Sequence, residues 1–241
     1  MSLDEILSSI FPAGHGVMVQ DGIALGSGRL KTGEELTVIG VSERTPVGVE
    51  QAISLSRHVL HSMADADGPF LVIIDSDSQR MSRRDELLGL NEFLAHLAKS
   101  LILADIGGRP TIGLLYGHTA AGAFLATAMA TRVLVALPSA DPVVMDLPSM
   151  SRVTKLSIEV LEEKARSTPV FAPGLHNLER MGAVHVVWDE RTPLCEQLSQ
   201  LLADIPSRSD RRDELGNERG GRMKAAEIAR RVNELARAEP R

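Results

Sequence analysis

The sequence has little of what several classes of protein need. Cys195 is its single cysteine, so neither an internal disulfide nor a cysteine-based metal cluster can form within these 241 residues. We expect Cys195 to be a small apolar side chain on a helix rather than a nucleophile. Aromatic residues make up 3% of the chain, too few to provide stacking platforms for single-stranded nucleic acid. The formal net charge of −6 provides no general attraction to phosphate backbones or anionic lipid.

Long hydrophobic runs and targeting segments are also missing. The uncharged stretch 119–131 is too short, and too rich in Thr and Ala, to span a bilayer. At the N-terminus, residues 3–10 predict a short helix preceded by Ser2 and carrying two acidic residues in its first turn, not a leader peptide. We therefore expect a cytoplasmic protein that binds neither membranes nor nucleic acid.

What the sequence does contain is an aliphatic core arranged in alternating patterns. Apolar residues make up 44% of the chain, and a fold of this length can bury roughly three quarters of its chain surface. A hairpin is predicted at 22–41, strands at 70–74, 111–116, 133–137, 143–145 and 183–188, and helices at 46–63, 84–105, 158–166, 175–181 and 193–204. This alternation predicts an α/β protein with a mostly parallel sheet. It does not separate a doubly wound sheet from a ββα superhelix.

The composition changes near the C-terminus. We predict a domain over residues 1–205, a polar linker over 206–222 and a C-terminal amphipathic helix over 223–241. Met223, Ile228, Val232 and Leu235 share one face of this helix. That face packs on its own domain or docks on a partner.

The strand–turn–helix unit at 111–132 is the strongest candidate site. Gly117 ends a buried strand, Thr119 can cap the following helix, and Ala121, Gly122 and Ala123 keep its first turn free of bulky side chains. Unpaired N–H groups at such a turn can bind a carbonyl oxygen, a carboxylate or an enolate. Alternatively, the small residues only permit tight packing of helix on sheet. No Gly-Lys-Ser/Thr follows, so this is not a Walker phosphate loop.

Other polar clusters carry weaker signals. Asp75 and Asp77 follow a buried strand and could hold Mg²⁺, but turn formation and capping of the next helix are favoured. His58 and His61 could share a metal, although a solvated helix face is favoured. His118 lies inside the glycine turn, where it could donate to a ligand, shuttle a proton or only brace the turn. Gly-x-Ser-x-Gly is absent, so a nucleophile elbow has no support.

The order of these elements resembles the crotonase superfamily, in particular its carboxyltransferase branch. More narrowly, the chain is similar to the γ subunits of biotin-independent malonate decarboxylase over residues 15–205. The segments that carry this resemblance are 75–89, 111–123, 130–138, 144–150 and 167–174. The resemblance implies a crotonase-like ββα superhelix, to which the C-terminal amphipathic helix is appended.

The resemblance also implies an activity. Such subunits pair with a homologous β subunit, and the pair decarboxylates malonyl-S-acyl carrier protein to acetyl-S-acyl carrier protein and CO₂. The acyl group is carried on the phosphoribosyl-dephospho-CoA group of an acyl carrier subunit, and an α subunit transfers the carrier to fresh malonate. The β subunit is expected to hold the thioester. The γ subunit is expected to be inactive alone and to supply the opposite wall of the site, which is lined by backbone amides. This chain itself is expected to bind no cofactor, no biotin and no metal.

The resemblance assigns two sets of residues in this sequence, one catalytic and one that lines the substrate-binding site. The catalytic group is Ala121, Gly122, Ser78 and Gln79, and the substrate-binding residues are Gly117, His118, Thr119, Ala120 and Ala123. Two positions depart from the family pattern. Ser78 stands where the pattern has a glycine that permits a positive φ. The helix start has one glycine instead of a pair, and Ala121 can still donate its amide if its φ is negative.

Two other functions fit the same sequence. One is a non-catalytic scaffold that stabilises the β subunit. The other is a stand-alone enoyl-CoA hydratase or isomerase. Such an enzyme usually needs carboxylates beside its oxyanion loop, and residues 117–124 contain none.

Overall fold

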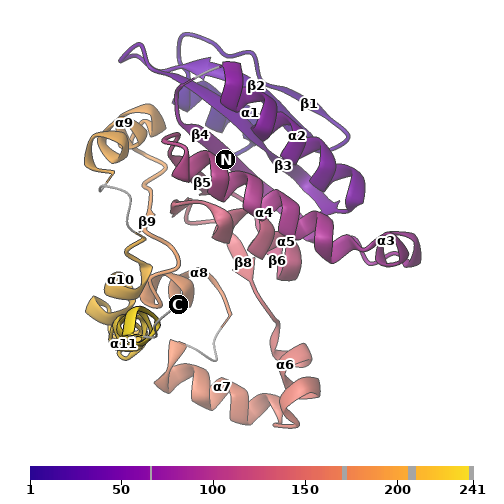
Figure 1. The fold of residues 1–241 in the computed structure, drawn as a ribbon, viewed down its shortest axis with the longest axis vertical. Helices are drawn as coiled ribbons and strands as arrows, with labels where there is room; N and C mark the ends of the chain where they lie inside the picture. The colour runs from indigo at the N-terminus through magenta and orange to yellow at the C-terminus, as the bar shows by residue number, and fades with distance from the viewer. Residues whose placement is uncertain (66, 170–172, 206–209, 239–241) are drawn as a thin grey trace. The chain divides into compact units, whose positions relative to one another are not determined.

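The computed structural model describes residues 1–65, 67–169, 173–205 and 210–238. The chain divides into two compact units, Met1–Val144 with Val186–Arg208, and Met145–His185 with Ser209–Arg241 (Figure 1). The first unit contains the main sheet and every residue of the candidate site. The second unit is built from helices.

The first unit is organised around a seven-stranded sheet of order β1-β2-β3-β4-β5-β7-β9. Its strands are β1 Met18–Gln20, β2 Ile23–Arg29, β3 Glu35–Val47, β4 Phe70–Gln79, β5 Thr111–Leu115, β7 Val133–Ala136 and β9 Val186–Val187. The first three pair antiparallel, which confirms the predicted hairpin, and the strands from β3 onward pair parallel. All five residues of β5 are buried, as a strand covered on both faces requires. A separate parallel pair joins β6 His118–Ala120 to β8 Asp141–Val143.

The helices of this unit are α1 Leu3–Ile10, α2 Val49–Asp65, α3 Arg83–Leu88, α4 Leu90–Ile106, α5 Ala121–Ala126 and α9 Leu194–Asp204, with a 3₁₀ turn at Ala128–Ala130. The helix α1 has the predicted bounds, and Ser2 and Glu5 form a capping box at its start. Apolar residues of α1 and α9 belong to one core cluster with alternate residues of β4 and β5. Cys195 is buried in α9, as expected.

Two predicted boundaries were wrong for identifiable reasons. Pro46 was expected to open a helix, but β3 continues through it to Val47 beside β4, and α2 begins at Val49. The single helix expected over 84–105 is two helices, because Gly89 adopts a left-handed φ of 83° between α3 and α4. Figure 1 shows α3 at one end of α4, and Leu87 on α3 is exposed.

The second unit consists of α6 Leu147–Thr154, α7 Ile158–Ser167, α8 Leu175–Arg180, α10 Arg212–Glu218 and α11 Ala225–Ala238. The sequence analysis missed α6, whose signal is the Asp146 cap on the Ser149 amide with a proline in the first turn. The helix α10 lies inside the stretch expected to be a linker. Arg219, just after α10, donates to the carbonyl oxygens of Glu179, Val184 and His185. The division into 1–205, 206–222 and 223–241 stays a prediction.

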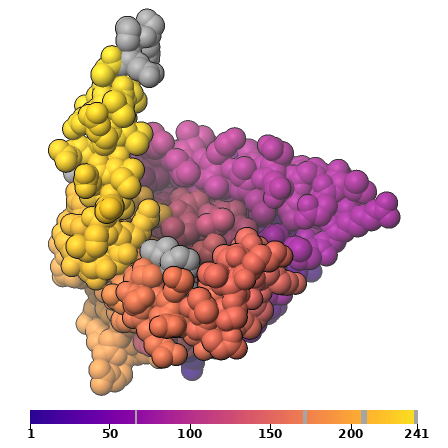
Figure 2. All heavy atoms as spheres, turned by 90° about the horizontal axis from the view of Figure 1, so that it is seen from below, coloured from indigo at the N-terminus to yellow at the C-terminus, as the bar shows by residue number. Residues whose placement is uncertain are grey.

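The amphipathic helix predicted at the C-terminus is present as α11, and none of its residues is buried. Ile228, Val232 and Leu235 are more than half exposed, and Figure 2 shows α11 in yellow with its side chains at the surface. The choice between packing of this face on the main domain and docking on a partner stays a prediction. Among the described residues, no helix is both long enough and apolar enough to cross a membrane.

Candidate functional site

Three hydrogen bonds join the end of β4 to the segment that leads into α5. Asp75 Oδ1 accepts from the His118 amide at 3.0 Å, the Ser76 and Thr119 hydroxyls lie 2.8 Å apart, and the Gly122 amide donates to Gln79 Oε1 at 2.8 Å. Because parallel strands place their carboxyl ends at one edge of a sheet, residues 75–79 and 117–122 meet here. Two of the segments that carry the family resemblance, 75–89 and 111–123, therefore meet at this point.

The Asp75 carboxylate accepts hydrogen bonds from two backbone amides. Its second oxygen accepts from the Arg44 amide at 3.2 Å, so it links the end of β3 to the glycine turn. At Gly117, a Cβ atom would lie 2.2 Å from Asp75 Oδ1, which explains why glycine is needed here. The favoured interpretation of Asp75 and Asp77 as helix-capping turn residues was wrong, because both lie in β4 and Ser82 caps α3. Among the described residues, no group of three side chains could hold a metal ion.

Thr119 does not cap the following helix, contrary to expectation. Its hydroxyl is fully buried against Ser76, and the residue at the N-cap of α5 is Ala120, which has no capping side chain. No side chain caps the first turn of α5. One amide of this turn donates to a side chain of β4, which is Gln79.

The Gly122 amide is occupied by a carboxamide oxygen. Gln79 Oε1 sits where an oxygen of an incoming acyl group would accept the same hydrogen bond. A Cβ at Gly122 would lie 3.1 Å from that oxygen and 3.2 Å from Leu94 Cδ1, so even alanine is tight here. A side chain at Gly122 would therefore need the Gln79 and Leu94 side chains to give way by a few tenths of an ångström.

Ala121 has a left-handed backbone, with a φ of 48°. The condition of a negative φ, under which alanine was expected to keep its amide as a donor, is therefore not met. The conformation costs about 1 kcal/mol or more for a residue with a Cβ, and such strain concentrates at functional sites. Ser78, in contrast, lies in β4 and is not among the described residues with positive φ, so serine fits there without strain.

His118 is paired through its ring. Its Nδ1 lies 3.0 Å from Asp141 Oδ2, and the two residues are register partners in the β6–β8 pair. Asp141 was not predicted as a site residue, because it lies between two predicted strands and its contact with His118 comes from pairing between strands. The neighbouring Tyr116 stays neutral, because burial and the charges of Asp75 and Glu43 raise the pKa of its phenol well above the usual value.

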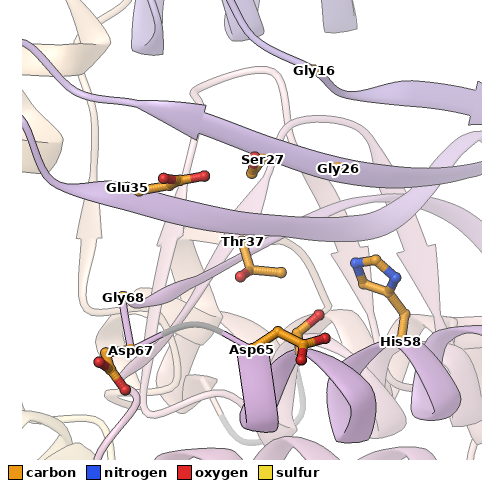
Figure 3. A pocket seen from close by; sticks show the side chains of 10 residues that line it. Gly16, Gly26, Ser27, Glu35, Thr37, His58, Asp65, Asp67 and Gly68 are labelled. Carbon is orange, nitrogen blue, oxygen red and sulfur yellow. The ribbon is translucent and has the colours of Figure 1, made fainter.

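A hollow of about 500 Å³ lies at the opposite, amino end of β3 and β4. Figure 3 shows Glu35, Asp65, Asp67 and the His58 ring around it. Arg109 lies close by, but its guanidinium is committed to oxygens of Gly68, Ser62 and Thr37. The hollow is therefore acidic and unsuited to an anionic substrate. Burial, and then the charge of His61, lower the pKa of His58.

The fold belongs to the crotonase-like carboxyltransferases. Over 86% of the chain, it superposes on 40% of a transcarboxylase 12S chain with a TM-score of 0.68 at 15% identity, which shows the common fold. The ββα superhelix expected from the resemblance is thereby confirmed.

Within that class, the chain belongs to the malonate decarboxylase gamma subunit family, whose model matches residues 42–236. A chain of a Pseudomonas malonate decarboxylase hetero-tetramer, solved in complex with coenzyme A, is 25% identical with a TM-score of 0.77, covering 96% of this chain and 98% of that one. The malonyl-S-ACP:biotin-protein carboxyltransferase MADD of Malonomonas rubra is 28% identical over 211 residues, covering 77% of this chain and 72% of the relative.

Proposed function

We propose that this chain is the γ subunit of a malonate decarboxylase, and that with its β subunit it converts a malonyl thioester on an acyl carrier protein to the acetyl thioester and CO₂. Family membership supports the reaction class. The observation that carries the assignment of the site is the Gly122 amide bonded to Gln79 Oε1 beside the strained Ala121. A backbone donor built at such cost is typical of a site that stabilises negative charge.

The chemistry requires such a donor. When the bond to the carboxylate breaks, its electron pair moves into the thioester and forms an enolate. A donor aimed at that developing charge is worth about 3 kcal/mol. In this proposal Gly122 and Ala121 supply the amides, and the Gln79 carboxamide moves aside when the substrate oxygen binds. Ser78, on the same strand end, and Gly117, His118, Thr119, Ala120 and Ala123 form the wall around them.

The remaining parts of the assembly follow the family resemblance. The β subunit holds the thioester, a carrier subunit presents it on phosphoribosyl-dephospho-CoA, and an α subunit recharges the carrier. The chain is inactive without its β partner, binds no cofactor itself, works without biotin and acts in the cytoplasm. A multisubunit assembly is supported by the Pseudomonas relative, which is part of a hetero-tetramer.

The test is turnover by the purified β–γ pair with malonyl-carrier substrate, following CO₂ and acetyl thioester. Gly122→Leu should abolish turnover and leave pairing with the β subunit intact. Gly16→Ala is the control, because a Cβ there meets only the Ser27 carbonyl oxygen, at 3.7 Å. Unchanged turnover by Gly122→Leu would remove this loop from the reaction, and normal turnover by the β subunit alone would make this chain a scaffold.

A second candidate is carboxyl transfer to a biotin protein, which is the activity that the name of the Malonomonas rubra relative gives. Release of CO₂ in the absence of any biotin protein, unaffected by avidin, supports decarboxylation. A requirement for a biotinylated acceptor supports transfer. An enoyl-CoA hydratase has no comparable support, since the Asp75 carboxylate beside the turn accepts from two backbone amides.

A further inference from the structure

His118 is held at three points. Its amide donates to Asp75 Oδ1 at 3.0 Å, and its ring Nδ1 lies 3.0 Å from Asp141 Oδ2. The next residue, Thr119, is fixed to Ser76 by a fully buried hydroxyl pair. Bracing the turn requires only the backbone contacts. The bond to the ring orients the imidazole as well, which is what a proton-transferring histidine needs.

The Asp141 contact determines which nitrogen is available. A carboxylate only accepts, so Nδ1 bears the hydrogen and Nε2 is the second site of protonation. In the part of the chain that the structure describes, Nε2 has no hydrogen-bond partner. The His118 side chain is 16% exposed and that of Asp141 is 72% exposed. The imidazole is therefore sheltered but still reaches water, from which Nε2 can regain a proton.

Among the described elements that pack against β6, no other side chain offers the same chemistry. These elements are β4, β8 and α5. Their acidic and basic side chains are Asp75 and Asp77 on β4 and Asp141 on β8, and α5 has none. Asp75 and Asp141 already contact the amide and the ring of His118, and imidazole is the side chain that proteins use most often for general acid–base catalysis.

His118 also lies at the same strand end as the amide pocket. It is four residues from Gly122 along the chain. Both residues are bonded to β4, one through Asp75 and the other through Gln79. The proposal requires that a malonyl group with its oxygen on the Gly122 amide turns its methylene carbon toward the imidazole.

We propose that His118 protonates the acetyl enolate. The inference rests on the proposed function and names its proton donor. The C–C bond to the carboxylate breaks, CO₂ leaves, and the electron pair remains as the thioester enolate. The enolate carbon then takes the proton from Nε2 of the imidazolium, forming the methyl group, and the neutral imidazole regains a proton from water. Asp141 is a positioning residue that keeps Nδ1–H in place.

The experiment uses the β–γ pair with His118→Gln, and with His96→Gln as a control, since His96 is an exposed histidine on α4. Acetyl thioester formation should fall about 100-fold in the first variant and stay unchanged in the second. A separate assay incubates acetyl thioester with the pair in D₂O and follows exchange of the methyl hydrogens, which is the reverse of the protonation step. Exchange should be lost in His118→Gln.

Asp141→Asn provides an independent test that leaves the histidine in place. It keeps an acceptor for Nδ1–H but removes the negative charge beside the ring. The pH above which activity is lost should therefore be lower in this variant. Asp141→Glu, which keeps the charge, should restore the wild-type pH profile. If the wild-type pair releases CO₂ while His118→Gln keeps turnover and exchange within twofold, the proposal is overturned. If His118→Gln fails to pair, an unshifted Asp141→Asn profile overturns it. If the wild-type pair releases no CO₂, the proposed function itself fails.

Discussion

The amino edge of the main sheet, where the parallel strands begin, and its carboxyl edge, where they end, differ in the groups that they offer a ligand. At the amino edge, a hollow of about 500 Å³ is open but lined by Glu35, Asp65 and Asp67. At the carboxyl edge, Asp75 and Gln79 accept hydrogen bonds from backbone amides and thereby fix their positions. The larger space is thus on the side with repelling charge, and the oriented donors are on the other. For an anionic substrate, donors decide the site and volume does not.

The largest effect is expected from Gly117→Ala, which attacks the organised edge directly. The added Cβ would lie 2.2 Å from Asp75 Oδ1 and 2.8 Å from Asp75 Cβ, so the turn must shift. We expect a loss of about 3 kcal/mol in the free energy of unfolding, measured by urea denaturation. Turnover of the β–γ pair should be lost as well. If the urea midpoint of Gly117→Ala equals that of the wild type, the turn is not held by Asp75.

Asp75→Ala removes the acceptor without adding bulk. The amides of Arg44 and His118 lose their partner, and we expect a loss of about 2 kcal/mol in unfolding free energy. The same change should lower turnover, because His118 is no longer positioned. Asp77→Ala is the matched control, since Asp77 is exposed on the same strand. Equal effects of the two variants would contradict the role given to Asp75.

Ala121→Gly tests whether strain is stored at this edge. Glycine adopts the φ of 48° without a Cβ penalty, so the unfolding free energy should rise by about 0.5 kcal/mol despite the greater freedom of the unfolded chain. Turnover should be retained, because glycine donates the same amide. The measurement is the melting temperature of each variant. Ala123→Gly is the control, because Ala123 is buried inside the same helix. Destabilisation by both changes would mean that Ala121 is not strained.

The smallest effect is expected at the amino edge. Burial lowers the pKa of folded His58 below its unfolded value near 6.5, so the unfolded chain takes up a proton first as the pH falls. Stability is then unaffected well above pH 6.5 and decreases as the pH falls through that value. In His58→Gln, the decrease in melting temperature between about pH 7 and pH 5 should be smaller, with turnover unchanged. A loss of turnover would place the hollow in the reaction.

Much of the fold was accessible from the sequence, because its signals are local. The cap at Ser2, the buried run from Phe70 and the pattern leading to α11 each predict their element. The contacts of the site were less accessible. Nothing local shows that Thr119 bonds to Ser76 instead of capping α5, or that Asp141 reaches His118, because each partner comes from another strand. The φ of Ala121 is likewise set by the tertiary fold, against the preference of alanine.

The two bonds of Asp75 have a further consequence. One carboxylate holds the left-handed bend at Glu43 and Arg44 on one side of β4 and the glycine turn at His118 on the other. These segments are far apart in sequence, yet neither can open without releasing a shared acceptor. Their fluctuations should therefore be correlated, and anything that binds at the Arg44 bend would alter the rigidity of the turn from a distance.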